Sequence, residues 1–90
     1  MKYEWDENKN HLNIEKHFID FNDAKEIFND DCRLEYMVHK NNEDRVVVIG
    51  NVNDIVIVVV YTMRKKNIRI ISARVARRIE RKEYKERNKK

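Results

Sequence analysis

Arginines within and just after one apolar segment are the side chains of this sequence best suited to chemistry. Arg69 interrupts the isoleucine-rich segment 68–73, and Arg74 follows it. A guanidinium group binds phosphate oxygens in a bidentate manner and stays charged at any working pH. A charge in an apolar strand must reach solvent, an ion partner or a ligand. Arg69 and Arg74 are therefore candidates to bind phosphate, and the alternative for Arg69 is a structural ion pair with Glu43 or Glu80.

Three further charged side chains extend this set. Glu43 and Arg45 are two residues apart, so on a strand they share one face. They either pair with each other or face a groove beside the last strand. Arg64 falls in the turn expected after a central strand, where loops often hold functional side chains, although a turn arginine is more often solvated.

A polar stripe on the first expected helix supplies another group of candidates. Lys9, Asn13 and Lys16 fall on one helical side, which either holds a nucleic-acid backbone or is a solvated face. His17 follows them, and a histidine can act as acid or base because it titrates near neutral pH. The alternative for His17 is a bond to a backbone carbonyl at the end of the helix.

Charge is unevenly distributed along the chain. Residues 1–73 hold 11 basic and 13 acidic side chains, whereas residues 74–90 hold 9 and 3. Such a basic segment attracts phosphate or an acidic protein surface, and charge alone does not choose between them. Charged residues make up 40% of the chain, but 41% is apolar and concentrated in β-branched runs, which argues against disorder. We expect one domain over residues 1–90 with a modest core, and with residues 88–90 frayed.

Several function classes are disfavoured. The single cysteine, Cys32, cannot form an internal disulfide, and its place in an apolar alternation predicts a small core residue. No signal peptide precedes the charged first residues, so we expect a cytoplasmic protein. The longest apolar run, Ile55 to Tyr61, is too short to cross a bilayer, so no membrane partner is expected. His11 and His17 match no metal-binding spacing, so neither a metal nor another cofactor is expected.

Two helices are expected in the first third of the chain. Asp6 can cap a helix that runs through Lys16. A second, shorter helix is indicated by apolar residues within 21–28, with Asp23 and Glu26 spaced like a capping box.

The rest of the chain is typical of strands followed by one helix. Residues 32–38 alternate apolar and polar side chains, as expected of an edge strand. Segments 46–49 and 55–61 are apolar at every position, so both of their faces must be covered, and their short connection predicts an antiparallel hairpin. The segment 68–73 is a further strand, and Ser72 is expected to cap a final helix from Arg74 to about Glu86. The expected fold class is α+β, with a mainly antiparallel sheet of about four strands, two N-terminal helices and one C-terminal helix.

Three blocks of residues together resemble one protein family over the span from Trp5 to Tyr84. The first block is Trp5-Asp6-Glu7 with Lys9-Asn10, Asn13, Lys16-His17, Phe21, Ala24 and Phe28. The second is Glu43 and Arg45 before Gly50, and the third, the most specific, is Arg69-Ile70-Ile71-Ser72-Ala73-Arg74 followed by Ala76, Glu80 and Tyr84. The chain resembles the BrnT family of type II toxins. It departs at Phe18, where the family usually has glycine after the lysine–histidine pair.

The resemblance implies a fold, an activity and a set of partners. The implied fold is RelE-like, and the implied activity is cleavage of messenger RNA without a metal, which inhibits translation. The implied partners are the RNA substrate, a BrnA-type antitoxin with a ribbon-helix-helix DNA-binding domain, and operator DNA reached through the toxin–antitoxin complex. The alternative is a non-catalytic interaction domain that binds an antitoxin and contributes to operator binding.

Metal-free RNA cleavage needs a base for the ribose 2′-hydroxyl, an acid for the departing 5′-oxygen, and cations around the phosphorus. The cationic candidates are Arg64, Arg69 and Arg74. The candidates for proton transfer are Lys16, His17 and Glu43. The remaining candidates for RNA binding are Lys9, Asn13, Arg45 and Tyr84. Tyr84 either stacks on a base or packs beside the core.

Overall fold

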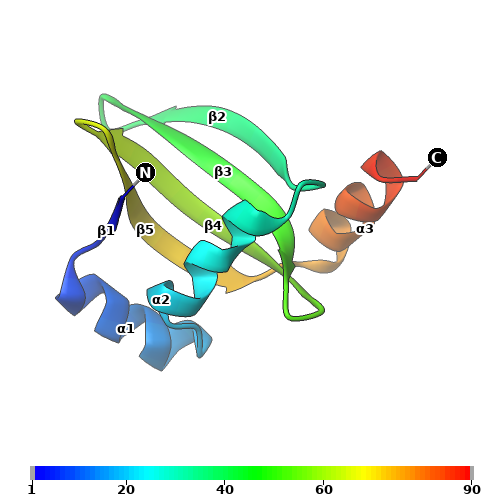
Figure 1. Ribbon diagram of the computed structural model, residues 1–90, viewed down its shortest axis with the longest axis horizontal. Coiled ribbons are helices and arrows are strands. Elements are labelled where there is room, and N and C mark those ends of the chain that lie inside the picture. Colours follow the sequence, from blue (N-terminus) through cyan, green and yellow to red (C-terminus); the bar gives the residue numbers. More distant parts are fainter. Residues whose placement is uncertain (1, 90) are drawn as a thin grey trace.

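The computed structural model describes residues 2–89 and contains one sheet of five strands in the order β1-β5-β4-β3-β2 (Figure 1). The strands are β1 (Tyr3–Glu4), β2 (Leu34–Lys40), β3 (Glu43–Val52), β4 (Ile55–Arg64) and β5 (Asn67–Val75). β1 runs parallel to β5, and the other neighbours are antiparallel. The α+β class and the mainly antiparallel sheet are confirmed, and two-residue β1 is the strand beyond the four expected.

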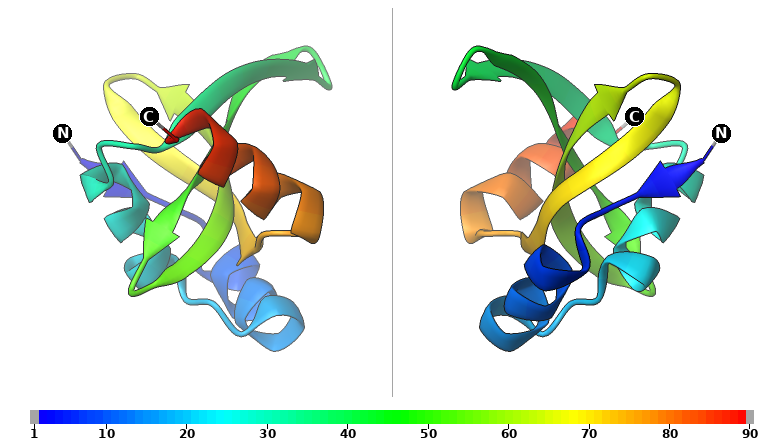
Figure 2. Two further views of the ribbon diagram at one scale, coloured as in Figure 1. Left: turned by 90° about the vertical axis from the view of Figure 1, so that its right-hand side faces the viewer. Right: turned by 90° about the vertical axis from the view of Figure 1, so that its left-hand side faces the viewer.

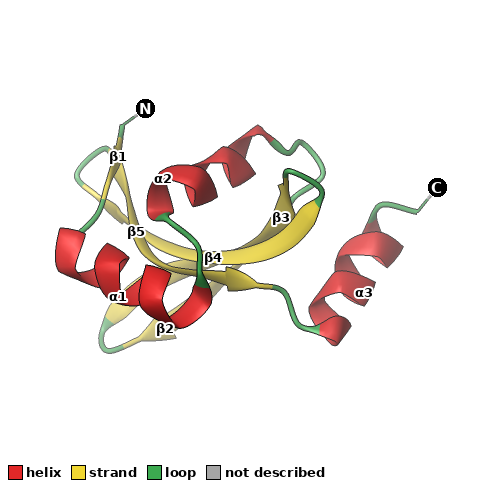
Figure 3. Ribbon diagram, turned by 90° about the horizontal axis from the view of Figure 1, so that it is seen from below, coloured by secondary structure: helices red, strands yellow, loops and turns green. Residues whose placement is uncertain are grey.

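The helices are α1 (Glu7–His17), α2 (Phe21–Ala24), the 3-10 helix η1 (Lys25–Asn29) and α3 (Arg78–Arg87). Figure 3 shows α1 and α2 beside each other against the sheet and α3 apart from them at one end. Within residues 2–89, no helix is long and apolar enough to span a membrane.

Aspartates begin both N-terminal helices. As predicted, the Asp6 carboxylate caps α1 by accepting two backbone N–H groups of the first turn. The predicted capping box of Asp23 and Glu26 is wrong, because Asp20 caps α2 and accepts a backbone N–H there. α2 starts at Phe21, which is fully buried on its packed side.

Phe18 ends α1 in a left-handed backbone conformation, with φ 60° and ψ 27°. Its N–H donates to the carbonyl of Ile14, which closes the last turn. Glycine is favoured at such a position because a Cβ atom crowds the backbone there. The Phe18 side chain is 88% exposed, so the phenyl ring gains almost no burial in return.

The main core lies between the sheet and the helices α1, α2 and η1, on the side that we call the helical face (Figure 2). Its buried residues are Phe21, Ala24, Ile27, Val48, Ile57, Val59, Ile68, Ile70 and Ala73. Trp5 packs against this core. The fully apolar runs of β3 and β4 are central strands joined as a hairpin, which confirms the sequence prediction.

A smaller cluster lies on the opposite side of the sheet. Ile49, Val58 and Ala76 are buried there, and Tyr84 packs against them from α3. No residue within α3 itself is buried. Through Tyr84, α3 covers one end of this face of the sheet, and the rest of the face is open to solvent.

The prediction that the final helix starts at Arg74 is wrong. β5 continues to Val75 because β4 begins early enough to pair with it, through Ile57 and Val75. Ser72 is consequently a strand residue paired with Val60, not a helix cap. α3 begins after Arg77, whose N–H donates to the Glu80 carboxylate at 2.7 Å.

Asn13 is buried, which contradicts its predicted place on a solvated, RNA-binding stripe. Its amide nitrogen donates to the carbonyls of Ala73 and Ile19, each at 2.9 Å, and its amide oxygen accepts the Ala73 N–H at 3.2 Å. The side chain thus pairs with Ala73 as a neighbouring strand would. A helical spacing cannot reveal this role, because it depends on β5 lying against α1.

Cys32 is exposed in the turn before β2, so the prediction of a core cysteine is wrong. The strand starts at Leu34, and the apolar alternation overran it by two residues. β2 is an edge strand, as predicted.

Candidate functional site

Three arginines lie on the sheet side opposite the helical face, which we call the arginine face. Strand partners share a face, and Arg69 pairs with Thr62, whereas Arg74 pairs with Val58 four residues earlier on β4. Arg69 and Arg74 are five residues apart, so regular alternation would place them on opposite faces. An irregularity in the pairing inserts one residue between Ile70 and Ser72, and this brings both arginines to one side.

Arg45 joins them from β3. It pairs with Val38 of β2, in the same alternation as Val47 and Ile49. Ile49 is in the small cluster under α3, so Arg45 belongs to the arginine face as well. The three guanidinium groups thus come from β3 and from both ends of β5.

Each of these arginines is held by a glutamate. The nearest N–O distances are 2.8 Å for Arg69 with Glu4 and 3.3 Å for Arg45 with Glu43. Arg74 and Glu80 form a bidentate pair with two 2.7 Å bonds. The arginine side chains keep 20 to 26% of their surface exposed, so they are oriented by the glutamates but remain open to solvent.

The ion pairs correct one prediction and support another. The expected partner of Arg69 was Glu43 or Glu80, whereas the observed partner is Glu4. Sequence reasoning missed Glu4 because it lies 65 residues from Arg69 in the chain. The parallel pairing of β1 with β5 brings the two residues together. The pairing of Glu43 with Arg45 is one of the two alternatives that their spacing left open.

Hydrogen bonds from neighbouring side chains hold the carboxylates of Glu80 and Glu4 in the ionised form. The bonds from Arg74, with that from the Arg77 N–H, lower the pKa of Glu80 to about 2, against the opposing effect of burial. Bonds from Asn67 and Arg69 lower the pKa of Glu4. Both glutamates are therefore charged at neutral pH and are unsuited to donate protons.

A strip of less polar side chains separates the arginines. Tyr36, Val47, Val60 and Ser72 are successive partners across β2, β3, β4 and β5, so they form one row on the arginine face. All four retain solvent exposure. The arginine face therefore combines cations with an apolar floor.

Arg64 and Lys9 are exposed, as a solvated or ligand-binding side chain would be. Arg64 is the last residue of β4 and lies close enough to Glu4 to contribute to its lowered pKa. It extends the arginine face at that end. Lys9 lies on α1, and so does Lys16, which is also exposed.

The structure does not bring His17 to the arginines. His17 lines an apolar groove of about 390 Å³ together with Ile57 and Val75. Ile57 and Val75 are strand partners, and Ile57 belongs to the core of the helical face, so the groove lies on that face. Its ring makes no hydrogen bond to another residue in the range 2–89, so the alternative of a carbonyl-bonded histidine also lacks support. The sheet lies between His17 and the arginine face. Of the three residues predicted to move protons, Glu43 alone shares a face with the arginines.

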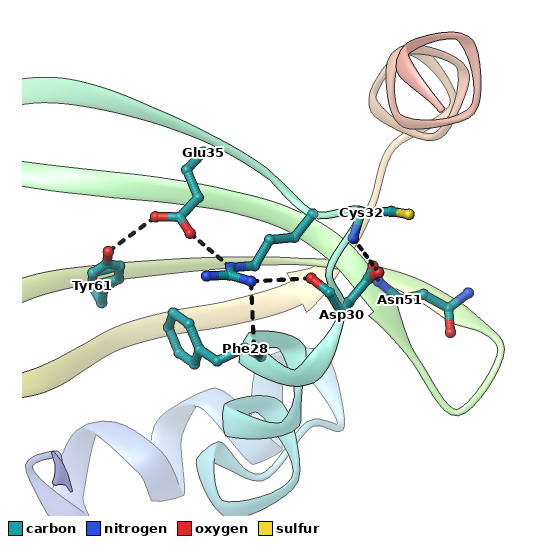
Figure 4. Close-up of polar contacts among 7 residues, drawn as sticks. Phe28, Asp30, Cys32, Glu35, Asn51 and Tyr61 are labelled. Atoms are coloured by element: carbon teal, nitrogen blue, oxygen red, sulfur yellow. Dashed lines mark hydrogen bonds and ion pairs between the residues drawn. The ribbon is translucent and has the colours of Figure 1, made fainter. Parts of the chain in front are cut away.

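Tyr84 has a structural contact. Its phenol donates a 2.6 Å hydrogen bond to Asp30, and burial together with this bond raises the pKa of Tyr84 to about 12. The same carboxylate accepts the N–H groups of Cys32 and Asn51, which Figure 4 shows. Tyr84 thereby fixes α3 to the turn before β2. Residues 2–89 contain no group of three His, Cys, Asp or Glu side chains placed to hold a metal ion.

Comparison with known protein families identifies the family of this chain. A family model described as the ribonuclease toxin BrnT of type II toxin–antitoxin systems matches residues 5–80. The chain belongs to the BrnT family. Membership makes it a toxin of a ribonuclease family, with RNA as the target and an antitoxin as the partner. A comparison with curated proteins gave no significant match. The matched span includes Arg45, Arg69, Arg74 and the partner Glu80.

Proposed function

We propose that the arginine face of this BrnT-family chain is the active site of an endoribonuclease that cleaves messenger RNA without a metal ion. The observation that carries the proposal is that Arg45, Arg69 and Arg74 all lie on one open sheet face, each oriented by a glutamate. Guanidinium groups held in place before the substrate arrives stabilise charge on a phosphate without further reorganisation.

In the proposed reaction, the ribose 2′-hydroxyl attacks the adjacent phosphorus and the bond to the 5′-oxygen of the next nucleotide breaks. The products are a 2′,3′-cyclic phosphate and a 5′-hydroxyl. Arg69 and Arg74 bind the phosphate oxygens, whose negative charge increases as the phosphorus becomes five-coordinate. Glu43 accepts the 2′-hydroxyl proton, because it is the predicted proton-transfer residue on this face, and the departing 5′-oxygen takes its proton from water at this open face.

Basic residues outside this centre are proposed to bind the rest of the RNA. Arg64 extends the arginine face, and Arg45 remains partly open beside Glu43. The exposed side of α3 carries Arg78, Arg81, Lys82 and Lys85, whose charge attracts phosphates. We further propose that the toxin acts in the cytoplasm, inhibits translation, and is neutralised by a BrnA-type antitoxin that connects it to operator DNA.

Alanine substitution of the arginines tests the proposal. Arg69→Ala and Arg74→Ala are each expected to slow cleavage of a purified RNA by about 100-fold, as removal of one preorganised donor typically does. Expression of either variant should no longer arrest bacterial growth. Lys66→Ala, an exposed lysine in the β4–β5 turn, is the matched control and should retain full activity.

Antitoxin binding separates catalysis from the rival function. Both arginine variants should still bind the antitoxin, and a chelator should leave wild-type cleavage unchanged. If the folded wild-type protein leaves RNA and growth intact, the ribonuclease proposal is contradicted. Loss of antitoxin binding in Arg69→Ala, with no effect on RNA, would instead favour a non-catalytic interaction domain.

A further inference from the structure

Resting on the proposed function, we infer that Tyr36 is a base-stacking residue of the arginine face, and that the substrate is therefore single-stranded RNA with an unpaired base beside the cleaved phosphate. Tyr36 was not among the residues that the sequence singled out.

Tyr36 differs from the other aromatic residues that pack around the sheet. Tyr3 and Tyr61 contact the ring of Phe28, with centroids 5.5 and 5.3 Å away, and all three serve the helical face. The Tyr84 phenol is bound by Asp30. Tyr36 is 45% exposed on the arginine face, and within residues 2–89 its side chain has neither a hydrogen bond nor an aromatic partner. Its ring is free to contact a ligand.

The surroundings of Tyr36 suit a nucleotide. Val47 is its direct strand partner and continues the apolar floor, and Arg74 lies on the same face of the sheet. Tyr36 also lines a groove of about 420 Å³ between β2 and α3, which Arg87 borders. This volume lies within the range of small-molecule sites. An aromatic ring on the same face as the guanidinium groups offers contacts for a base and for its phosphate.

The strand that carries Tyr36 is held firmly at its start. The Arg33 guanidinium donates to the carbonyls of Phe28 and Asp30 and pairs with Glu35 at 2.7 Å. Glu35 also accepts the Tyr61 hydroxyl, as Figure 4 shows. These contacts lie on the helical side of β2, so they fix the strand without covering the Tyr36 ring. A fixed platform loses little conformational freedom when a ligand binds.

Stacking on an aromatic ring requires a base whose face is accessible. Bases in a duplex are already stacked on their neighbours, so sheet aromatics bind bases of single strands, loops and bulges. All four bases have such a face, and stacking therefore tolerates many sequences. Tyr36 would position the RNA for the arginines and would not itself take part in the reaction.

A fluorescent RNA tests this inference. The probe is a single-stranded oligonucleotide that carries 2-aminopurine and 2′-O-methyl groups, which prevent cleavage. Wild-type protein should quench the 2-aminopurine signal, and Tyr36→Ala should weaken binding between about 5-fold and 100-fold. Tyr36→Leu, which keeps apolar area on the strand, should lose quenching as well. Tyr36→Trp should bind within about 3-fold of wild type, because the larger ring still stacks.

Met37→Ala is the matched control. Met37 is the next residue on β2, is similarly exposed at 68%, and points to the other side of the strand. The Met37→Ala variant should bind the RNA probe as tightly as the wild-type protein does. With cleavable RNA, Tyr36→Ala should raise KM more than it lowers kcat, because the ring acts in binding.

The outcomes distinguish this inference from the proposed function. If wild-type protein cleaves RNA while Tyr36→Ala and Tyr36→Leu bind the probe as tightly as wild type, the stacking role is wrong and the ribonuclease proposal stands. If the wild-type protein binds the probe with quenching but does not cleave RNA, the proposed catalysis fails and the stacking role stands. If it binds duplex RNA as tightly as the single strand, the substrate class is wrong.

Discussion

The two faces of this sheet treat polar side chains in opposite ways. On the helical face, the buried amides of Asn10 and Asn13 are hydrogen-bonded to neighbouring groups, and no buried side-chain polar atom among residues 2–89 lacks a partner. On the arginine face, charges are paired but open to solvent. Buried bonds contribute strongly to stability because breaking them leaves groups unsatisfied, whereas exposed pairs contribute little. The comparison predicts that folding depends on the helical face and RNA chemistry on the other.

The largest effect on stability is expected at Asn13. Asn13→Leu removes three hydrogen bonds and leaves the N–H and carbonyl of Ala73 without their partners. Unfolding free energy should fall by about 3 to 5 kcal/mol, measured by urea denaturation. Asn8→Leu is the control, because Asn8 is exposed on the same helix and should change stability by less than about 0.5 kcal/mol. Equal effects of the two substitutions would contradict the strand-like role of Asn13.

The next largest loss of stability is expected for a substitution at Gly50. A Cβ atom at this position would lie 2.7 Å from Cγ1 of Ile27, which is fully buried and cannot move aside. Gly50→Ala should destabilise the protein by about 1 to 3 kcal/mol through overpacking. Adding Ile27→Ala removes the clash, so the double variant should be more stable than the sum of the two single effects predicts. Simple additivity would show that the clash is not the cause.

A smaller and pH-dependent effect is expected at Glu80. Its pKa of about 2 lies below the ordinary value of 4.5, so the contribution to stability is present above about pH 4.5 and is lost as the pH falls toward 2. Glu80→Gln should cost on the order of 1 to 2 kcal/mol at pH 7, and its difference from wild type should shrink below pH 4. Glu83→Gln is the matched control, because Glu83 is exposed on α3 and forms no ion pair within residues 2–89, and it should change stability at pH 7 by less than about 0.5 kcal/mol. Thermal unfolding from pH 2 to 7 measures both.

The smallest effect, here on RNA cleavage, is expected for substitutions on the helical face of the sheet. Lys16→Ala and His17→Ala should leave RNA cleavage within about 2-fold of wild type, because neither side chain shares the arginine face. By contrast, Glu43→Gln changes a residue on the arginine face and should slow cleavage by about 100-fold or more if Glu43 accepts the 2′-hydroxyl proton. A folded His17→Ala protein that fails to cleave RNA would place part of the active site on α1, on the helical face.

The sequence was sufficient to predict the elements whose residues carry a local signal. Apolar runs without polar interruption predicted the central hairpin, because such runs need cover on both faces. Asp6 predicted the start of α1 through its capping chemistry. The arginines were singled out because a charge within an apolar strand is costly without a partner.

Features that depend on distant pairing could not be predicted. Glu4 meets Arg69 through a two-residue parallel strand that has no pattern of its own. The extra residue in β5, which puts Arg69 and Arg74 on one face, is set by its register with β4. Asn13 looked like a member of a polar helical stripe because its partner lies 60 residues away. The choice of face, which decides whether His17 can reach the arginines, therefore needed the structure.

The pairing of Asn13 with Ala73 also decides where the sheet can grow. β5 has its outer backbone occupied by β1 at Ile68 and Arg69 and by the Asn13 amide at Ala73, so a further strand has little room there. In the part of the chain that the structure describes, no strand covers the outer edge of β2. An extended peptide that adds to this edge of the sheet would align along β2. It would then lie next to Tyr36, at the border of the surface on which RNA is proposed to be cut.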